Sequence, residues 1–160
     1  VLAGADVVAY RSLAWAFNAS AAFGEKIAAE PAVIGSADFA STHLGYTFWF
    51  ASAENLAAFE AAPASYAPAW GGYCAYGISG YDGMNYLHSQ SQLSTVPSNV
   101  DRWAVLGDEQ KLYMFRGEEA MELFIDDTAR NLAGGEQMWA SWFGSCTGYY
   151  NTQCFKEGTR

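Results

Sequence analysis

The chain has 160 residues, of which 51% are hydrophobic and 16% aromatic, a composition typical of a globular protein rather than a disordered one. Its 17 acidic residues outnumber its 8 Lys and Arg residues, so the net charge is −9. This balance argues against nucleic acid and anionic membrane surfaces as partners, because both attract cationic side chains. No apolar run approaches the roughly 20 residues that span a bilayer. We therefore expect one domain over residues 1–160, with neither nucleic acid nor membrane as a partner.

The first predicted elements combine one long helix with a strand pair and a short helix. Residues 12–30 are rich in Ala and end before a proline, which favours a helix. Residues 38–45 are typical of a strand that enters a turn, and the aromatic run 46–50 is a short strand. Ser52 is a good N-cap for a helix over residues 53–62.

The second half of the chain continues this mixture of strands and helices. Residues 80–101 are rich in Ser, Gln, Gly and Asn and predict a long irregular loop, and residues 111–115 predict a strand. Residues 118–133 predict an amphipathic helix that Gly134-Gly135 breaks, with a last helical piece over 136–143. The pattern as a whole predicts an α+β fold, a small antiparallel sheet packed with helices.

Three cysteines divide into a C-terminal pair and a single thiol. Cys146 and Cys154 flank a short polar loop, where a disulfide would fix the tail; two free thiols in a reducing compartment are the alternative. Cys74 is then the thiol left over. Val1 in place of Met indicates a trimmed N-terminus, from a removed signal peptide or an arbitrary boundary, and Asn18 begins a glycosylation sequon. A removed signal peptide and a disulfide would both fit an exported protein, secreted or periplasmic.

The segment around Cys74 holds the most unusual local chemistry of the chain. A Gly-Gly pair at 71–72 precedes the thiol and lets the backbone turn sharply. The aromatic residues expected to wall the thiol are Tyr66, Trp70, Tyr73 and Tyr76. A thiol in this setting can ligate a soft metal, react as a nucleophile, or pack as a small hydrophobic residue.

Several segments, taken in chain order, resemble the YHS domain family and its exported branch with the Gly-Gly-Tyr-Cys-Ala element. The segments are Gly4-Ala-Asp-Val-Val-Ala-Tyr10, Gly35-Ser-Ala-Asp-Phe39, Phe48-Trp-Phe-Ala-Ser-Ala-Glu-Asn55, Phe59, Tyr66-Ala-Pro68 and Gly71-Gly-Tyr-Cys-Ala75. The resemblance covers roughly residues 4–80 and extends weakly to the strand at 111–115 and to the Trp-containing end near Trp142. It implies a compact YHS-like core over about 4–80, with a strand and helix extension over about 103–160.

The resemblance also shows which metal site the chain lacks. Many YHS and related metal-binding domains bind zinc or other soft metals through a Phe-Cys-Ser-x-x-Cys element. The matching residues here are 50–55, with Ala51 and Asn55 in the places of the two thiols. Alanine has no donor atom and an amide is a poor ligand for a soft cation, so a zinc-finger-like role is excluded.

The resemblance implies copper binding at the cysteine that the exported branch keeps, here Cys74. Cu(I) prefers thiolate, thioether and imidazole donors. The other candidate metal ligands are Met84 and His88, on the loop that follows the cysteine, and the distant His43. In a symmetric homodimer, two Cys74 thiolates would instead share the ion.

Three functions stay open at this point. The first is a Cu(I)-binding protein, and the second is an interaction or scaffold module in which Cys74 is a buried structural residue. The third is a thiol-based enzyme or redox protein, in which His88 or His43 would act as the base. No Cys-x-x-Cys pair, Gly-x-Ser-x-Gly elbow or His-Glu-x-x-His motif is present, so we expect a binding protein rather than an enzyme.

Overall fold

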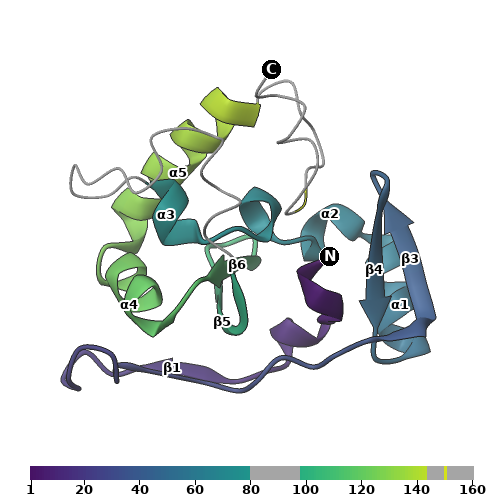
Figure 1. Cartoon of the computed structure of the whole chain (residues 1–160), viewed down its shortest axis with the longest axis horizontal. Coiled ribbons are helices and arrows are strands. Elements are labelled where there is room, and N and C mark those ends of the chain that lie inside the picture. Colours follow the sequence, from purple (N-terminus) through teal and green to yellow (C-terminus); the bar gives the residue numbers. More distant parts are fainter. Residues whose placement is uncertain (80–97, 144–149, 151–160) are drawn as a thin grey trace.

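Three two-stranded antiparallel sheets and five α-helices make up the part of the chain that the structure describes, residues 1–79, 98–143 and 150. This computed structural model confirms the predicted α+β class, with small antiparallel sheets packed with helices (Figure 1). Within these ranges, none of the helices has the length and apolar character needed to cross a bilayer.

The first sheet corrects the helix predicted over residues 12–30. β1 (Trp15–Phe17) pairs antiparallel with β2 (Ile27–Ala29), and the hairpin is an extended arm along the bottom of Figure 1. Ala16 is exposed while its two neighbours in β1 are half-buried, so burial alternates with the period of a strand. The many Ala residues led to the wrong prediction of a helix, because the packing of alternate side chains in the hairpin outweighs their helix propensity.

The second hairpin and the helix after it confirm the prediction. β3 (Ser36–His43) pairs with β4 (Tyr46–Phe50), and Gly45 between them has a φ of 85°, the left-handed region that favours glycine. α1 (Ala53–Ala61) then begins after Ser52, whose hydroxyl accepts a backbone N–H bond of 3.2 Å from the first turn.

The middle of the chain holds two short helices and the third hairpin. α2 (Pro63–Tyr66) and α3 (Ala75–Ser79) precede it, and β5 (Asn99–Leu106) pairs with β6 (Lys111–Phe115). The predicted strand over 111–115 is therefore confirmed. The loop predicted over 80–101 lies mostly outside the described residues, and its last residues belong to β5 instead.

The C-terminal helices break at a different place from the one predicted. α4 (Glu118–Asp126) ends at Asp127, which has the non-helical angles φ −138° and ψ 62°. α5 (Thr128–Phe143) then runs without interruption through Gly134 and Gly135, so the predicted break at this pair is wrong.

The two glycines of α5 serve close packing rather than helix termination. A Cβ at Gly134 would lie 2.7 Å from the carbonyl oxygen of Ser79, at the end of α3. A Cβ at Gly135 would lie 2.1 Å from the indole ring of Trp70. Only glycine lets α5 approach these two neighbours so closely, which explains glycines in the interior of a helix.

Buried side chains form two hydrophobic clusters. The first includes Cys74, Ile78, Phe115, Met121 and Phe124. The second includes Tyr10, Phe48, Phe50, Phe59 and Trp103. Cys74 thus belongs with α3 and α4, whereas the β3–β4 hairpin and α1, on the opposite side of Figure 1, contribute Phe48, Phe50 and Phe59 to the second cluster.

A buried carboxylate joins the N-terminus to the start of α1. Asp6 is 0% exposed; its Oδ1 accepts from the backbone N–H groups of Val8 at 2.9 Å and Ala9 at 3.2 Å. Its Oδ2 accepts from the backbone N–H of Ala51 at 2.8 Å and from Nδ2 of Asn55 at 2.7 Å. Ala51 and Asn55, at which the predicted resemblance would place two thiols, are thus hydrogen-bonded to this carboxylate in a structural role.

Candidate functional site

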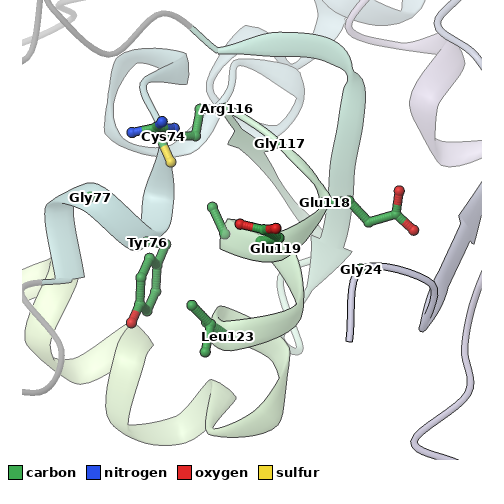
Figure 2. A pocket seen from close by; sticks show the side chains of 10 residues that line it. Gly24, Cys74, Tyr76, Gly77, Arg116, Gly117, Glu118, Glu119 and Leu123 are labelled. Atoms are coloured by element: carbon green, nitrogen blue, oxygen red, sulfur yellow. The ribbon is translucent and has the colours of Figure 1, made fainter. Parts of the chain in front are cut away.

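Cys74 lines a pocket of about 550 Å³ (Figure 2). The thiol lies between a 3-10 helix over Ala69–Gly72 and α3. Gly71 and Gly72 have φ values of 66° and 75°, so the backbone before the thiol follows a path that glycine adopts without strain. The predicted sharp turn at this pair is confirmed, and Figure 2 shows the sulfur directed into the pocket.

Four stretches of the chain supply the walls of this pocket. They are the turn of the β1–β2 hairpin, the start of α3, the connection from β6 to α4, and the first turns of α4. The lining residues are Gly24, Cys74, Tyr76, Gly77, Arg116, Gly117, Glu118, Glu119, Ala120 and Leu123. The site is thus assembled from segments that are distant in sequence, with both charged and apolar surfaces.

The surroundings of the thiol act on its ionisation in opposite directions. Burial raises the pKa of the Cys74 thiol, because a thiolate is poorly solvated away from water. Backbone N–H groups of Gly77, Arg116 and Tyr76, together with the positive charge of Arg116, act to lower the pKa, but burial dominates. The folded protein therefore makes Cys74 harder to ionise than an ordinary cysteine, and the thiol is protonated at pH 7.

Alkylation of Cys74 by iodoacetamide is expected to become fast only at a pH above the thiol's ordinary value of 9.0, because only the thiolate reacts and its pKa is raised. The same shift makes the folded state less stable as the pH rises above that value, since the unfolded chain ionises first. Peptide mass spectrometry would follow Cys74 separately from the other two cysteines, with the urea-unfolded protein as control. A half-maximal rate below pH 8 would contradict this and indicate a nucleophilic thiol.

Three charged side chains line the pocket, and among the described residues one of them forms an ion pair. Glu118 pairs with Arg102 at 3.6 Å and points away from the pocket in Figure 2. The side chains of Arg116 and Glu119 have neither a hydrogen bond nor an ion pair within the described part of the chain. In Figure 2, the Arg116 guanidinium lies at Cys74 and the Glu119 carboxylate projects toward the interior. Both residues are exposed, so in the described part of the chain their charges face solvent at the edge of the pocket.

The wall formed by the hairpin turn is held in place by a buried carboxylate. Glu122 of α4 is 0% exposed, and its oxygens accept from the backbone N–H groups of Gly24 at 2.7 Å and Lys26 at 2.5 Å. Lys26 also forms an ion pair with Asp126 at 3.4 Å. These contacts fix the turn of the β1–β2 hairpin against α4, so that Gly24 becomes part of the pocket.

The structure does not bring His43, one of the predicted metal ligands, to Cys74. Its ring lies against Phe59 and Tyr150, with ring centroids 6.0 Å and 6.1 Å apart, and both neighbours belong to the second cluster. Met84 and His88 lie outside the described residues. In residues 1–79, 98–143 and 150, no group of three or more His, Cys, Asp or Glu side chains could hold a metal ion.

The structure tests the predicted aromatic wall around Cys74 but not the predicted disulfide. Three of the four aromatic residues, at positions 70, 73 and 76, share the cluster of Cys74. Tyr66 does not: it packs against the second cluster, and the guanidinium of Arg11 lies 4.2 Å from its ring centroid. Cys146 and Cys154 lie outside the described residues, so their pairing stays a prediction.

Arg116 and Glu119 are the pocket residues that sequence reasoning missed. Neither was among the predicted site residues, and both follow the thiol by about forty residues in the sequence. The available signal was the run Arg116-Gly117-Glu118-Glu119, a charged turn between a predicted strand and a predicted helix. Charged residues in such a turn usually face solvent. They become part of a pocket only when the fold packs another segment of the chain against the turn.

Comparisons of the chain with protein-family models, with curated proteins and with solved structures found no match. The resemblance to the YHS family stays a prediction that rests on the ordered segments of the sequence.

Proposed function

We propose that this chain is a metal-binding protein of the exported YHS-like kind, and that it binds Cu(I) through the Cys74 thiolate. The observation that carries the proposal is the position of the sulfur. Cys74 is 1% exposed in the folded chain, yet it lines a pocket of about 550 Å³ instead of being enclosed on all sides. A soft donor at the wall of a sheltered pocket suits a soft, monovalent cation.

The chemistry of the site supports a thiolate complex. Cu(I) binding would displace the thiol proton to solvent, which couples metal affinity to pH. The thiolate and Cu(I) together are neutral, so the nearby charge of Arg116 repels the complex less than it would a free cation. Backbone N–H groups near the sulfur, from Tyr76, Gly77 and Arg116, would stabilise the coordinated thiolate as outer-shell donors do in other metal sites.

A second donor would come from one of three sources. Met84 and His88 follow Cys74 in sequence and carry a thioether and an imidazole. A second copy of the chain would supply another Cys74 thiolate across a two-fold axis. A small molecule in the pocket would be the third source.

Cys74→Ser is expected to weaken Cu(I) binding by more than about 100-fold, because changes outside the first coordination shell already cost 10–100-fold and this change removes a ligand. Binding would be measured on the reduced protein under anaerobic conditions, in competition with a Cu(I) chelator of known affinity. The matched control is the Cys146→Ser/Cys154→Ser double variant, which removes two thiols elsewhere and should bind as the wild type does. Equal affinity of wild type and Cys74→Ser would overturn the proposal.

A scaffold or interaction module is the second candidate function. One observation favours it: Cys74 belongs to a hydrophobic cluster with Ile78, Phe115 and Phe124, where a small apolar residue would pack equally well. The titration separates the two candidates, because a scaffold binds no Cu(I) in either wild type or variant. A nucleophilic Cys74, shown by fast alkylation below pH 8, would instead favour the third candidate, a thiol-based enzyme.

A further inference from the structure

The turn of the β1–β2 hairpin, residues 18–26, covers one side of the pocket through Gly24. We call this turn the hairpin tip; in Figure 1 it is the loop at the left end of the arm. Its own hydrogen bonds hold it together, because the backbone N–H groups of Asn18, Ala21 and Glu25 donate to carbonyls within the tip at 2.7–3.1 Å. A loop whose polar groups are satisfied internally can move as one unit without leaving those donors unpaired.

Every hydrogen bond and ion pair from the hairpin tip to another described part of the chain ends on one of two carboxylates of α4. Glu122 accepts from the backbone N–H groups of Gly24 at 2.7 Å and Lys26 at 2.5 Å. One turn further along the helix, Asp126 pairs with the Lys26 ammonium group at 3.4 Å. Polar contacts therefore hold the tip to a single helix, with the buried Glu122 as the central acceptor.

Apolar packing holds the base of the hairpin but not its tip. Ile27, the first residue of β2, is buried in the cluster of Cys74, and Trp15 and Phe17 of β1 pack against this cluster. Phe23, the largest apolar side chain of the tip, is 54% exposed. A two-stranded hairpin is only marginally stable by itself, so an arm that is anchored at its base alone opens more readily at its tip than the whole fold unfolds.

We propose that the hairpin tip is a lid over the pocket of Cys74, and that it opens as a unit about the base of the hairpin when its hydrogen bonds to Glu122 break. Opening removes Gly24 from the pocket wall and admits solvent and small reagents to the thiol. The base stays anchored by Ile27, so the two-stranded sheet and the rest of the fold persist in the open state. Access to Cys74 is gated in this way with or without a metal, so the lid does not rest on the proposed function.

Native-state hydrogen exchange of the wild type tests whether the tip opens without global unfolding. The amides of Gly24 and Lys26 donate to Glu122, so they exchange only when these hydrogen bonds break. Their exchange rates should be insensitive to low concentrations of urea, because a local opening exposes little surface. The amide of Phe124, within α4, should exchange faster as urea is added, as expected for unfolding of the core. If Gly24 and Lys26 show the same urea dependence as Phe124, the tip does not open separately and the proposal is wrong.

Glu122→Gln tests the contact that closes the lid. Glutamine is uncharged and keeps one acceptor oxygen, so at least one hydrogen bond to a charged acceptor is lost and the open population should rise by about tenfold or more. Alkylation of Cys74 by iodoacetamide at one fixed alkaline pH, followed by peptide mass spectrometry, should accelerate by a similar factor.

Glu119→Gln is the matched control for this variant. It removes the same charge from the same helix at the pocket, but in the described part of the chain Glu119 has no hydrogen bond to the tip, so Cys74 should react as in the wild type. Equal alkylation rates in wild type and Glu122→Gln, with both proteins folded by circular dichroism, would overturn the proposal. If Glu122→Gln does not fold, the hydrogen exchange of the wild type decides alone.

Discussion

Replacing Asp6 with alanine is expected to lower the free energy of unfolding by about 3–5 kcal/mol, because it leaves several buried donors without an acceptor. The carboxylate accepts four hydrogen bonds, from the backbone of Val8, Ala9 and Ala51 and from the Asn55 side chain. A loss of this size would remove a large part of a total stability that is commonly about 5–15 kcal/mol. Urea unfolding followed by far-UV circular dichroism would measure it.

Two further variants separate the hydrogen bonds of Asp6 from its charge and from general effects of substitution. Asp6→Asn keeps one acceptor oxygen and should cost less than Asp6→Ala, since some of the donors then retain a partner. Asp38→Ala removes an exposed carboxylate in β3 and should change the stability by no more than about 0.5 kcal/mol. A cost below about 1 kcal/mol for Asp6→Ala would show that water or rearranged side chains replace the carboxylate.

Gly135→Ala is expected to destabilise the protein by about 2–3 kcal/mol, the usual cost of forcing extra atoms into a packed core. The direction of this stability change is informative, because replacing glycine with alanine in a helix interior ordinarily stabilises a protein by about 1 kcal/mol. Here the new Cβ would lie 2.1–2.6 Å from three atoms of the six-membered ring of Trp70, so overlap outweighs helix propensity. Thermal unfolding by circular dichroism would measure the change.

A double-mutant cycle would test whether Trp70 is the cause. Trp70→Phe shortens the side chain and should relieve much of the overlap, so the double variant should lose less stability than the sum of the single variants. Trp70→Phe alone also removes the Nε1 hydrogen bond of 3.1 Å to Glu136, a cost that the cycle cancels. Ala133→Gly, at an exposed position of α5, reports helix propensity alone and should cost about 1 kcal/mol. Additive losses in the cycle would contradict the assignment.

The elements that the sequence analysis predicted correctly are those with short-range signals. β4 begins and ends at the predicted residues, because a run of aromatic and β-branched side chains fits a strand and Gly45 supplies the turn before it. α1 starts where the Ser52 hydroxyl can accept a hydrogen bond from the first turn. Such signals act within a few residues and need no knowledge of the rest of the fold.

The wrong predictions concern residues whose conformation depends on distant partners. The β1–β2 hairpin contains Ala-rich sequence, and its turn is fixed by the buried carboxylate of Glu122. The glycines at 134 and 135 remain helical because α3 and Trp70 pack against them. In the pocket, Cys74 was predicted as the key residue, but Arg116 and Glu119 reach it only through the packing of α4 on α3, which no local pattern encodes.

The hydrogen bond between Gly24 and Glu122 joins residues that are 98 positions apart, and it places one wall of the pocket. A pocket with such walls does not exist in the unfolded chain or in a fragment that lacks one of these segments. A ligand that occupies the pocket therefore binds the native state alone, and mass action would add about 2.7 kcal/mol to the stability of the whole chain at a ligand concentration 100 times its Kd. The melting temperature of this protein is thus itself a measure of pocket occupancy, available before the ligand has been identified.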